Sequence, residues 1–203
     1  MSKAYITQPE DISDRLCLSL VNFKKNEEFL KTKPYIKKGS MAVISLLNIS
    51  DNMFLPITNE MVEKWDIPMD RLFQMSKENA NKILPVKVEP LEKLIEQPKE
   101  RLVYNFSLDE SCNLADVLMI STEAYSLGAA SIFAEPHKLN EIADVYEGAD
   151  IYLFPICSEF TFAMPATSIS IEDVKEIFEN LTDIYELAKE DCISDSILMY
   201  NIC

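Results

Sequence analysis

Few residues of this sequence could act as catalytic groups, and a lone histidine limits how they combine. His137 is the only imidazole in 203 residues, so any serine or cysteine nucleophile would have to use it as its base. The candidate hydrolase site pairs Cys157 or Ser158 with His137, and Glu159 would orient the imidazole. We favour the alternative that His137 faces solvent in the first turn of a helix and Cys157 is a small buried hydrophobe. Catalysis requires a mutual geometry that spacing does not show.

Metal and nucleotide sites receive little support from the residues present. A structural zinc site needs four close Cys or His ligands, usually in paired spacings, and the sequence has no such pairs. Glycine-rich phosphate loops cannot be written, because Gly39, Gly128 and Gly148 are the only glycines. Acidic residues between 141 and 150 could bind magnesium, but their spacing opposite an apolar stripe is typical of a solvated helix face. The sequence therefore predicts neither a metal site nor a cofactor.

Charge is distributed unevenly along the chain. Residues 1–101 contain 16 Lys or Arg and 15 Asp or Glu, whereas residues 102–203 contain 3 and 19, which together give the net charge of −15. The second half would repel a phosphate backbone, so nucleic-acid binding is not expected there. An acidic surface is more typical of solubility than of one specific basic partner.

One basic run in the first half is the exception. Six lysines lie between Lys24 and Lys38, with Phe23, Phe29 and Tyr35 among them, and this combination superficially suits single-stranded nucleic acid. The alternative is a short helix whose buried side is formed by Phe29 and Leu30 and whose charged residues face water. We favour the alternative, because one short stretch is a small electrostatic footprint.

Met61 and Trp65 are the candidate residues for binding a protein partner or a ligand. They fall on one expected helix, and Met69, Phe73 and Met75 follow in the next. Methionine and aromatic residues can form an adaptable exposed surface. The same residues at helical spacing more often form a core, and the sequence does not separate the two alternatives.

Cysteine and hydropathy patterns predict an intracellular protein. Five cysteines form no C-x-x-C pair, which favours reduced thiols over a disulfide framework. No stretch of about 20 residues is continuously apolar, and residues 1–5 lack the pattern of an export signal. We expect a cytoplasmic protein with no membrane contact, and the oligomeric state stays open.

The first half predicts a strand, a helix, two strands and then three helices. Alternating apolar residues predict a strand over 14–22, and a short helix over 26–32 ends before Pro34. Turn residues at 50–52 predict a hairpin of two further strands. These strands cover 41–48 and 53–58. Three helices are then predicted at residues 60–65, with Asn59 as the cap, from about Pro68 to Pro85, and at 90–96.

The second half predicts strand, strand, helix, strand, strand, helix. Apolar runs indicate strands over 114–122 and 127–134, and a helix begins at Pro136 and ends at Gly148. Two strands are then expected to pair, the first near an edge or a bulge because it contains Pro155. These strands cover 151–156 and 160–164. A final amphipathic helix is predicted from Ser170, its N-cap, to Ala188.

The order of several motifs resembles that of a known family. The motifs are RLCLSLVNFKKNEEFL, PYIKKGSMAVISLL, LPITNEMVEKWDI, LFQMSKENANKILP, SLGAASIFA, EIADVYEGADIYLFP and ISDSILMYN. Over most of residues 14–201 the sequence is similar to a family of uncharacterised bacterial proteins from gut-type anaerobes. The resemblance implies no catalytic residues, because the family is a domain of unknown function. The family tends to show Ser-Ser-x-His-Glu after a Leu-Pro strand, whereas here Cys157, Ser158 and Glu159 follow, so the histidine is missing.

We therefore expect an α+β domain with two antiparallel sheets, or one mixed sheet, covered by helices. It is a single domain over 1–203, with a weak division into 1–97 and 101–203 where residues 97–100 are polar and rich in breakers. The preferred function is a noncatalytic cytoplasmic module that binds a protein or a small ligand. The alternatives are the small hydrolase and weak nucleic-acid binding through Lys24–Lys38.

Overall fold

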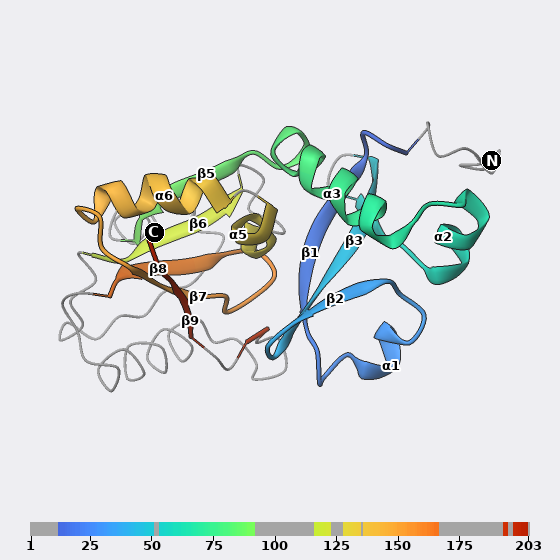
Figure 1. Cartoon of the computed structure of the whole chain (residues 1–203), viewed down its shortest axis with the longest axis horizontal. Coiled ribbons are helices and arrows are strands. Elements are labelled where there is room, and N and C mark those ends of the chain that lie inside the picture. The colour runs from blue at the N-terminus through green and yellow to red at the C-terminus, as the bar shows by residue number, and fades with distance from the viewer. Residues whose placement is uncertain are drawn as a thin grey trace, which may run out of the picture.

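The computed structural model describes residues 12–50, 53–91, 116–122, 128–134, 136–166, 193–194 and 197–202. Within these residues the chain forms two antiparallel sheets, which lie side by side in Figure 1 with the short helix α5 (Ser131–Ala134) between them. This confirms the predicted α+β fold, in its form with two antiparallel sheets.

The first sheet is built around its longest strand, β3 (Met41–Ser50). One edge of β3 pairs with β1 (Leu16–Asn22), and the other pairs with β2 (Tyr35–Lys38) and then β4 (Met53–Pro56). The strands predicted for this part of the chain are confirmed, and β2 is an additional one. Gly39, with φ of 60°, opens the two-residue loop between β2 and β3, where a left-handed backbone favours glycine.

Both faces of the first sheet are buried, which explains the apolar residues on both sides of β1. Leu18 and Leu20 pack with Phe73 of α3 (Met69–Ile83) on one face. On the other face Cys17 packs with Leu30 of α1 (Glu27–Leu30). The alternation of side chains along a strand therefore places two helices on opposite sides of the sheet.

The helices of the first half begin and end close to the predicted residues, with two corrections. Phe29 is 37% exposed, so Leu30 alone forms the buried side of α1. The cap of α2 (Asn59–Trp65) is Thr58, whose hydroxyl accepts a hydrogen bond from the Met61 amide at 3.2 Å. Thr58 has the extended backbone of an N-cap, whereas Asn59 is already helical.

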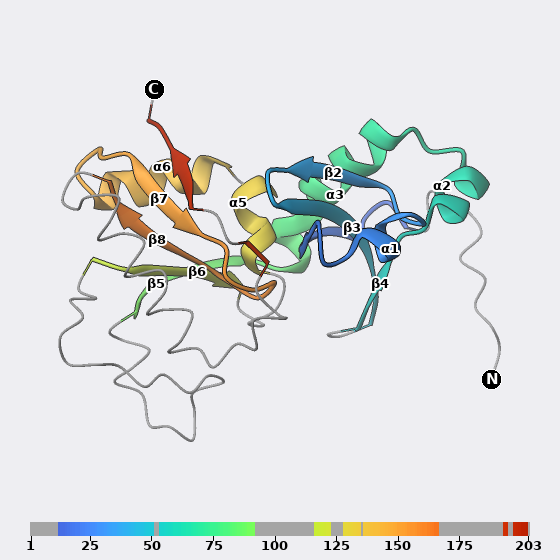
Figure 2. The same ribbon diagram turned by 90° about the horizontal axis from the view of Figure 1, so that it is seen from below.

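The second sheet has the strand order β5-β6-β8-β7-β9. Its strands are β5 (Val86–Pro90), β6 (Leu118–Thr122), β7 (Ile151–Phe154), β8 (Thr161–Pro165) and β9 (Leu198–Tyr200). The predicted pairing of the strands at 151–156 and 160–164 is confirmed by β7 and β8. Helix α6 (Pro136–Val145) covers one face, and its Leu139, Ile142 and Ala143 join Ile120 and Leu153 in a buried cluster. Figure 2 shows the same sheet from below.

Two predictions for the second half are wrong. In the apolar run predicted as a strand over 127–134, the described residues 128–134 are helical, with a 3-10 turn over Gly128–Ala130 followed by α5. The reason is that a short buried run has no periodicity that separates helix from strand. Pro90 ends strand β5, and the next residue, Leu91, is helical, which agrees with the start of the helix predicted over 90–96. β7 lies between β8 and β9, and Pro155 follows the strand's last residue. The predicted helix over 170–188 lies outside the described residues, as do residues 92–96 and the division at 97–100.

Two helices end in left-handed residues that are not glycine. After α2, Asp66 has φ of 51° and the Ile67 amide bonds the Val62 carbonyl at 3.3 Å. After α6, Glu147 has φ of 56° and the Gly148 amide bonds the Ala143 carbonyl at 2.9 Å. Both are Schellman ends, so α6 stops one residue earlier than Gly148 predicts.

Contacts between the two sheets bring together residues far apart in the sequence. Ile193 is buried against Leu18 and Leu20 of the first sheet, and its amide bonds the Ile156 carbonyl at 2.8 Å. The hydroxyls of Ser40 and Ser194 are 3.0 Å apart. The chain passes from the first sheet's helix α3 to the second sheet within Leu84–Pro85. The division into subdomains 1–97 and 101–203 stays a prediction.

Candidate ligand-binding groove

An open groove lies beside the first sheet, where the start of β2 meets helices α2 and α3. Its volume is about 520 Å³. Its lining combines a cation, an anion, an amide, a phenol and apolar groups, from Lys33, Pro34, Tyr35, Asn59, Val62, Glu63 and Met69. Such a mixture of apolar surface and a few polar groups is typical of ligand sites.

Proline explains why the groove forms at this point. Pro34 has no amide hydrogen, so β2 cannot extend its hydrogen bonds to the next position of β3. The Ile57 amide takes that place and bonds the Ser45 carbonyl at 3.0 Å. Asn59 then joins the start of α2 to the segment before β2, since its main-chain amide donates a hydrogen bond to the Thr32 carbonyl at 3.0 Å. The groove is therefore framed by main-chain hydrogen bonds between segments some 25 residues apart in sequence.

Helix α2 divides its side chains between the groove and the core. Glu63 is exposed and lines the groove, whereas Trp65 is only 6% exposed and packs in a buried cluster with Leu72 and Met75. Met61 is half-buried against that cluster. Of the two alternatives for these residues, Trp65 follows the core: the indole packs in the buried cluster, and the groove uses the neighbouring residues of the same helix. A partner-binding role of Met61 stays a prediction.

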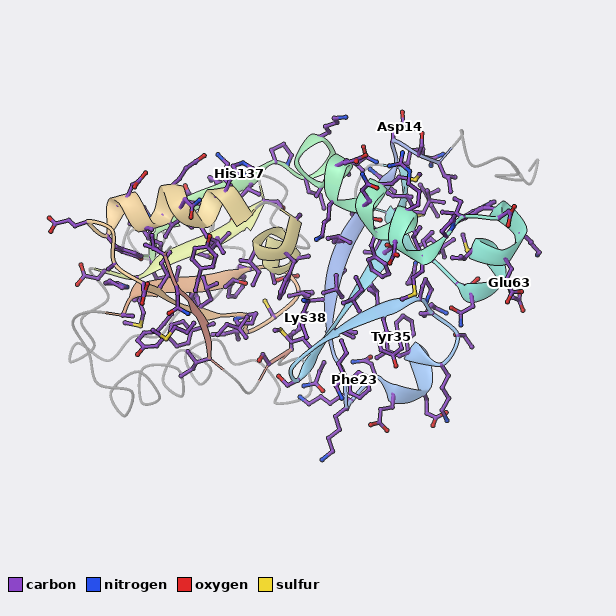
Figure 3. All side chains as sticks on the ribbon, in the orientation of Figure 1. Asp14, Phe23, Tyr35, Lys38, Glu63 and His137 are labelled. Carbon is purple, nitrogen blue, oxygen red and sulfur yellow. The ribbon has the colours of Figure 1, made fainter. Side chains whose placement is uncertain are left out.

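Lysine side chains cover the aromatic rings next to the groove. Lys37 Nζ lies 3.8 Å from the ring centroid of Phe23, and Lys33 Nζ lies 5.0 Å from that of Phe29. The rings of Phe23 and Tyr35 are 5.8 Å apart. Cation–π contacts of this kind occupy the ring faces on which nucleic-acid bases would stack. Figure 3 shows Phe23, Tyr35 and Lys38 gathered around β2.

A family model described as a family of unknown function (DUF5688) matches residues 1–201. The chain belongs to this family. No curated protein and no solved structure matches it. Membership in DUF5688 confirms the resemblance to a family without assigned function, and it supplies no functional residue.

The hydrolase candidates of this DUF5688 member lie on the second sheet. His137 is exposed in the first turn of α6, as Figure 3 shows. Cys157, Ser158 and Glu159 follow β7, where Cys157 is only 5% exposed and the Ser158 carbonyl accepts a hydrogen bond from the Ala129 amide at 3.2 Å. A nucleophile must contact its substrate, so burial gives Cys157 little support in this role, whereas Ser158 is half-buried. The hydrolase stays a prediction.

The described ranges offer little to a metal ion or a membrane. No group of three or more His, Cys, Asp or Glu side chains among those residues is placed to hold a metal ion. None of the helices described is long and apolar enough to cross a membrane.

Burial raises the pKa of the Cys17 thiol to about 12, so this cysteine is a neutral thiol at neutral pH.

The sequence singles out Tyr35, Asn59 and Met69 for other reasons, but it does not reveal that they line one groove with Glu63. Each is an ordinary polar or apolar residue at its position. They come together because the Ile57 amide bonds the Ser45 carbonyl of β3 at the position where Pro34 has no amide hydrogen. The one local signal is Pro34, which marks the end of the β2 ladder.

Proposed function

We propose that this protein is a noncatalytic module that binds a segment of another protein, or a small ligand, in the groove between β2, α2 and α3. The observation that carries the proposal is the groove itself, with about 520 Å³ of open volume and lining groups of mixed chemistry. Pockets of about 300–1,000 Å³ with this composition are the usual size of ligand sites. Burial of Cys157 weighs against the cysteine form of the hydrolase, whereas the half-buried Ser158 leaves the serine form as the alternative.

The proposal includes a cytoplasmic location and a bacterial source. Cys17 and Cys157 are buried cysteines outside any disulfide, which supports a reducing compartment. The family resemblance supports the source.

A groove-filling variant tests the proposed function. Met69 is 44% exposed in the first turn of α3, so Met69→Trp would place an indole in the groove without entering the core. Val145→Trp is the matched control, because Val145 is 67% exposed at the end of α6. The wild-type protein is screened against a displayed library of random eight-residue peptides and a library of small fragments. The affinity of each selected binder is then measured for the three proteins.

Binders of the groove should keep their affinity for Val145→Trp and lose about tenfold or more for Met69→Trp, about 1.4 kcal/mol. Selected binders with equal affinity for all three proteins would place binding elsewhere and refute the proposal. Screens that return no binder would refute it too.

A further inference from the structure

One edge of β2 carries main-chain groups that pair with nothing in the described part of the chain. β2 pairs with β3 in the register Lys38↔Met41, Lys37↔Ala42, Ile36↔Val43 and Tyr35↔Ile44. A two-residue hairpin loop is flanked by a hydrogen-bonded pair, here Lys38 and Met41, and bonded pairs alternate from there. The N–H and C=O groups of Ile36 and Lys38 therefore point to β3, and those of Tyr35 and Lys37 point away.

Hydrogen bonds between β3 and other segments confirm this alternation independently. The Ser45 carbonyl accepts from Ile57, on the edge shared with β2, and the Ser40 carbonyl accepts from Phe23, on the edge shared with β1. Odd-numbered residues of β3 thus bond towards β2, as Met41 and Val43 do in the derived register. The free edge formed by Tyr35 and Lys37 also continues directly into the groove, since Tyr35 lines both.

The surroundings of this edge have a charge opposite to that of the whole chain. Residues 22–40 contain six lysines and two glutamates, a net charge of +4, whereas the chain carries −15. Lys24, Lys25, Lys37 and Lys38 are all exposed. A free strand edge combined with positive charge is complementary to an extended, acidic chain.

We propose that the free edge of β2 binds an acidic, extended segment of a partner protein, which adds a strand to the first sheet and continues into the groove. The main-chain groups of Tyr35 and Lys37 would supply the hydrogen bonds, as in other complexes formed by strand addition. Successive side chains of the bound segment point to opposite faces, so carboxylates at alternate positions share one face and reach the lysine on that face. This inference rests on the proposed function and names the class of its ligand.

The lysines around β2 would also suit two different roles, each with its own expectation. Lysines on a short edge strand can simply prevent association with other strands. Nucleic acid is the other macromolecule that a basic surface can bind, but base stacking would have to displace Lys37 from the Phe23 ring and Lys33 from the Phe29 ring. The unpaired main-chain groups favour a peptide, because a nucleic acid has no strand edge to pair with them.

Fluorescence anisotropy with synthetic probes tests the inference. The probe is an acetylated, labelled eight-residue peptide in which Glu and Val alternate. The comparison probes are a peptide alternating Lys and Val and an oligonucleotide of eight thymidines. Two further acidic peptides carry N-methyl groups on every Val or on every Glu. Only one of these two sets of amides can face β2, so one N-methylated peptide should lose binding and the other should keep it.

Variants of Lys37 separate charge from main-chain pairing. Lys37→Ala removes the charge, and Lys37→Pro also removes the outward amide hydrogen while leaving the ladder to β3 intact. Lys77→Ala is the control, because Lys77 is exposed on α3 away from this edge. We expect Lys77→Ala to bind like the wild type and Lys37→Ala to bind a few-fold more weakly. Lys37→Pro should bind about tenfold more weakly than Lys37→Ala.

The peptide comparison stands without the variants, should Lys37→Pro fail to fold. Equal binding of both N-methylated peptides and the parent overturns the inference, since no main-chain pairing would be present. Stronger binding of the thymidine probe, or no binding of the acidic peptide at about 1 mM, also overturns it. If the screens give groove binders that Met69→Trp weakens, but the acidic peptides fail these tests, the proposed function stands and only this inference is refuted.

Discussion

Ser45 of β3 and Ser76 of α3 form a buried pair whose energetics can be worked out from the structure. Their hydroxyl oxygens are 2.9 Å apart, and Ser76 Oγ also donates to the Leu72 carbonyl at 2.9 Å. A hydroxyl has one hydrogen, so the Ser76 proton is committed to Leu72 and Ser45 must donate to Ser76. Both side chains are at most 1% exposed, so neither can turn to water.

Ser76→Ala would leave the Ser45 donor buried without an acceptor. That loss costs about 2 kcal/mol, and the better helix propensity of alanine offsets about 0.5 kcal/mol, which leaves about 1.5 kcal/mol of destabilisation. In the Ser45→Ala background no donor is left without an acceptor, so only the helix propensity changes and Ser76→Ala should stabilise the protein by about 0.5 kcal/mol. The coupling between the two sites is therefore about 2 kcal/mol.

Urea unfolding of the four proteins measures this coupling. Trp65, the only tryptophan, is buried in the cluster that includes Leu72 of α3, so its fluorescence reports on the packing of this helix. With a slope of about 2 kcal/mol/M, the single Ser76→Ala change should lower the midpoint by about 0.7 M. An equal shift in both backgrounds would show that Ser45 does not donate to Ser76, and the reasoning would be wrong.

Three further outcomes are expected. Tyr146→Phe removes a hydroxyl that bridges the carbonyls of Asp116 and Ala163 at 2.8 and 2.9 Å, and should cost about 1 kcal/mol, seen as a thermal midpoint lower by about 2–4 °C. Glu147→Gly removes the backbone strain of a non-glycine residue at φ of 56° and should raise the free energy of unfolding by about 0.5–1 kcal/mol in urea titrations. An unchanged free energy of unfolding would show that Glu147 is not strained. Cys17 has its pKa raised from 9.0 to about 12, so the unfolded chain deprotonates first as pH rises. Its contribution to stability is complete below pH 9, and by pH 10 the wild type should lose about 1.4 kcal/mol relative to Cys17→Ala, measured as the difference between the two pH profiles.

Strands and helices with strong periodicity could be predicted from the sequence. Leu16, Leu18 and Leu20 alternate with residues that are buried on the opposite face, and that pattern identifies β1. Helix α6 is identified in the same way by Leu139 and Ile142, which recur at three-residue spacing and form its inner face. In both cases local spacing alone determines which residues face the core.

Elements defined by long-range pairing could not be predicted. β2 has only four residues, and its one local signal is Gly39 at the hairpin loop. β5 lies between Pro85 and Pro90, which resemble helix boundaries, yet an edge strand tolerates proline. The groove is harder still, because it depends on Ile57 bonding to Ser45 where Pro34 cannot.

The position of Ile193 has a consequence for synthesis on the ribosome. Leu18 and Leu20 emerge early, but the cluster that buries them includes Ile193, more than 170 residues later in the sequence. During translation Phe73 can cover part of this apolar surface early, but the contact with Ile193 is missing until that residue has left the exit tunnel. A nascent chain stalled before that residue would therefore present a natural binding surface for chaperones.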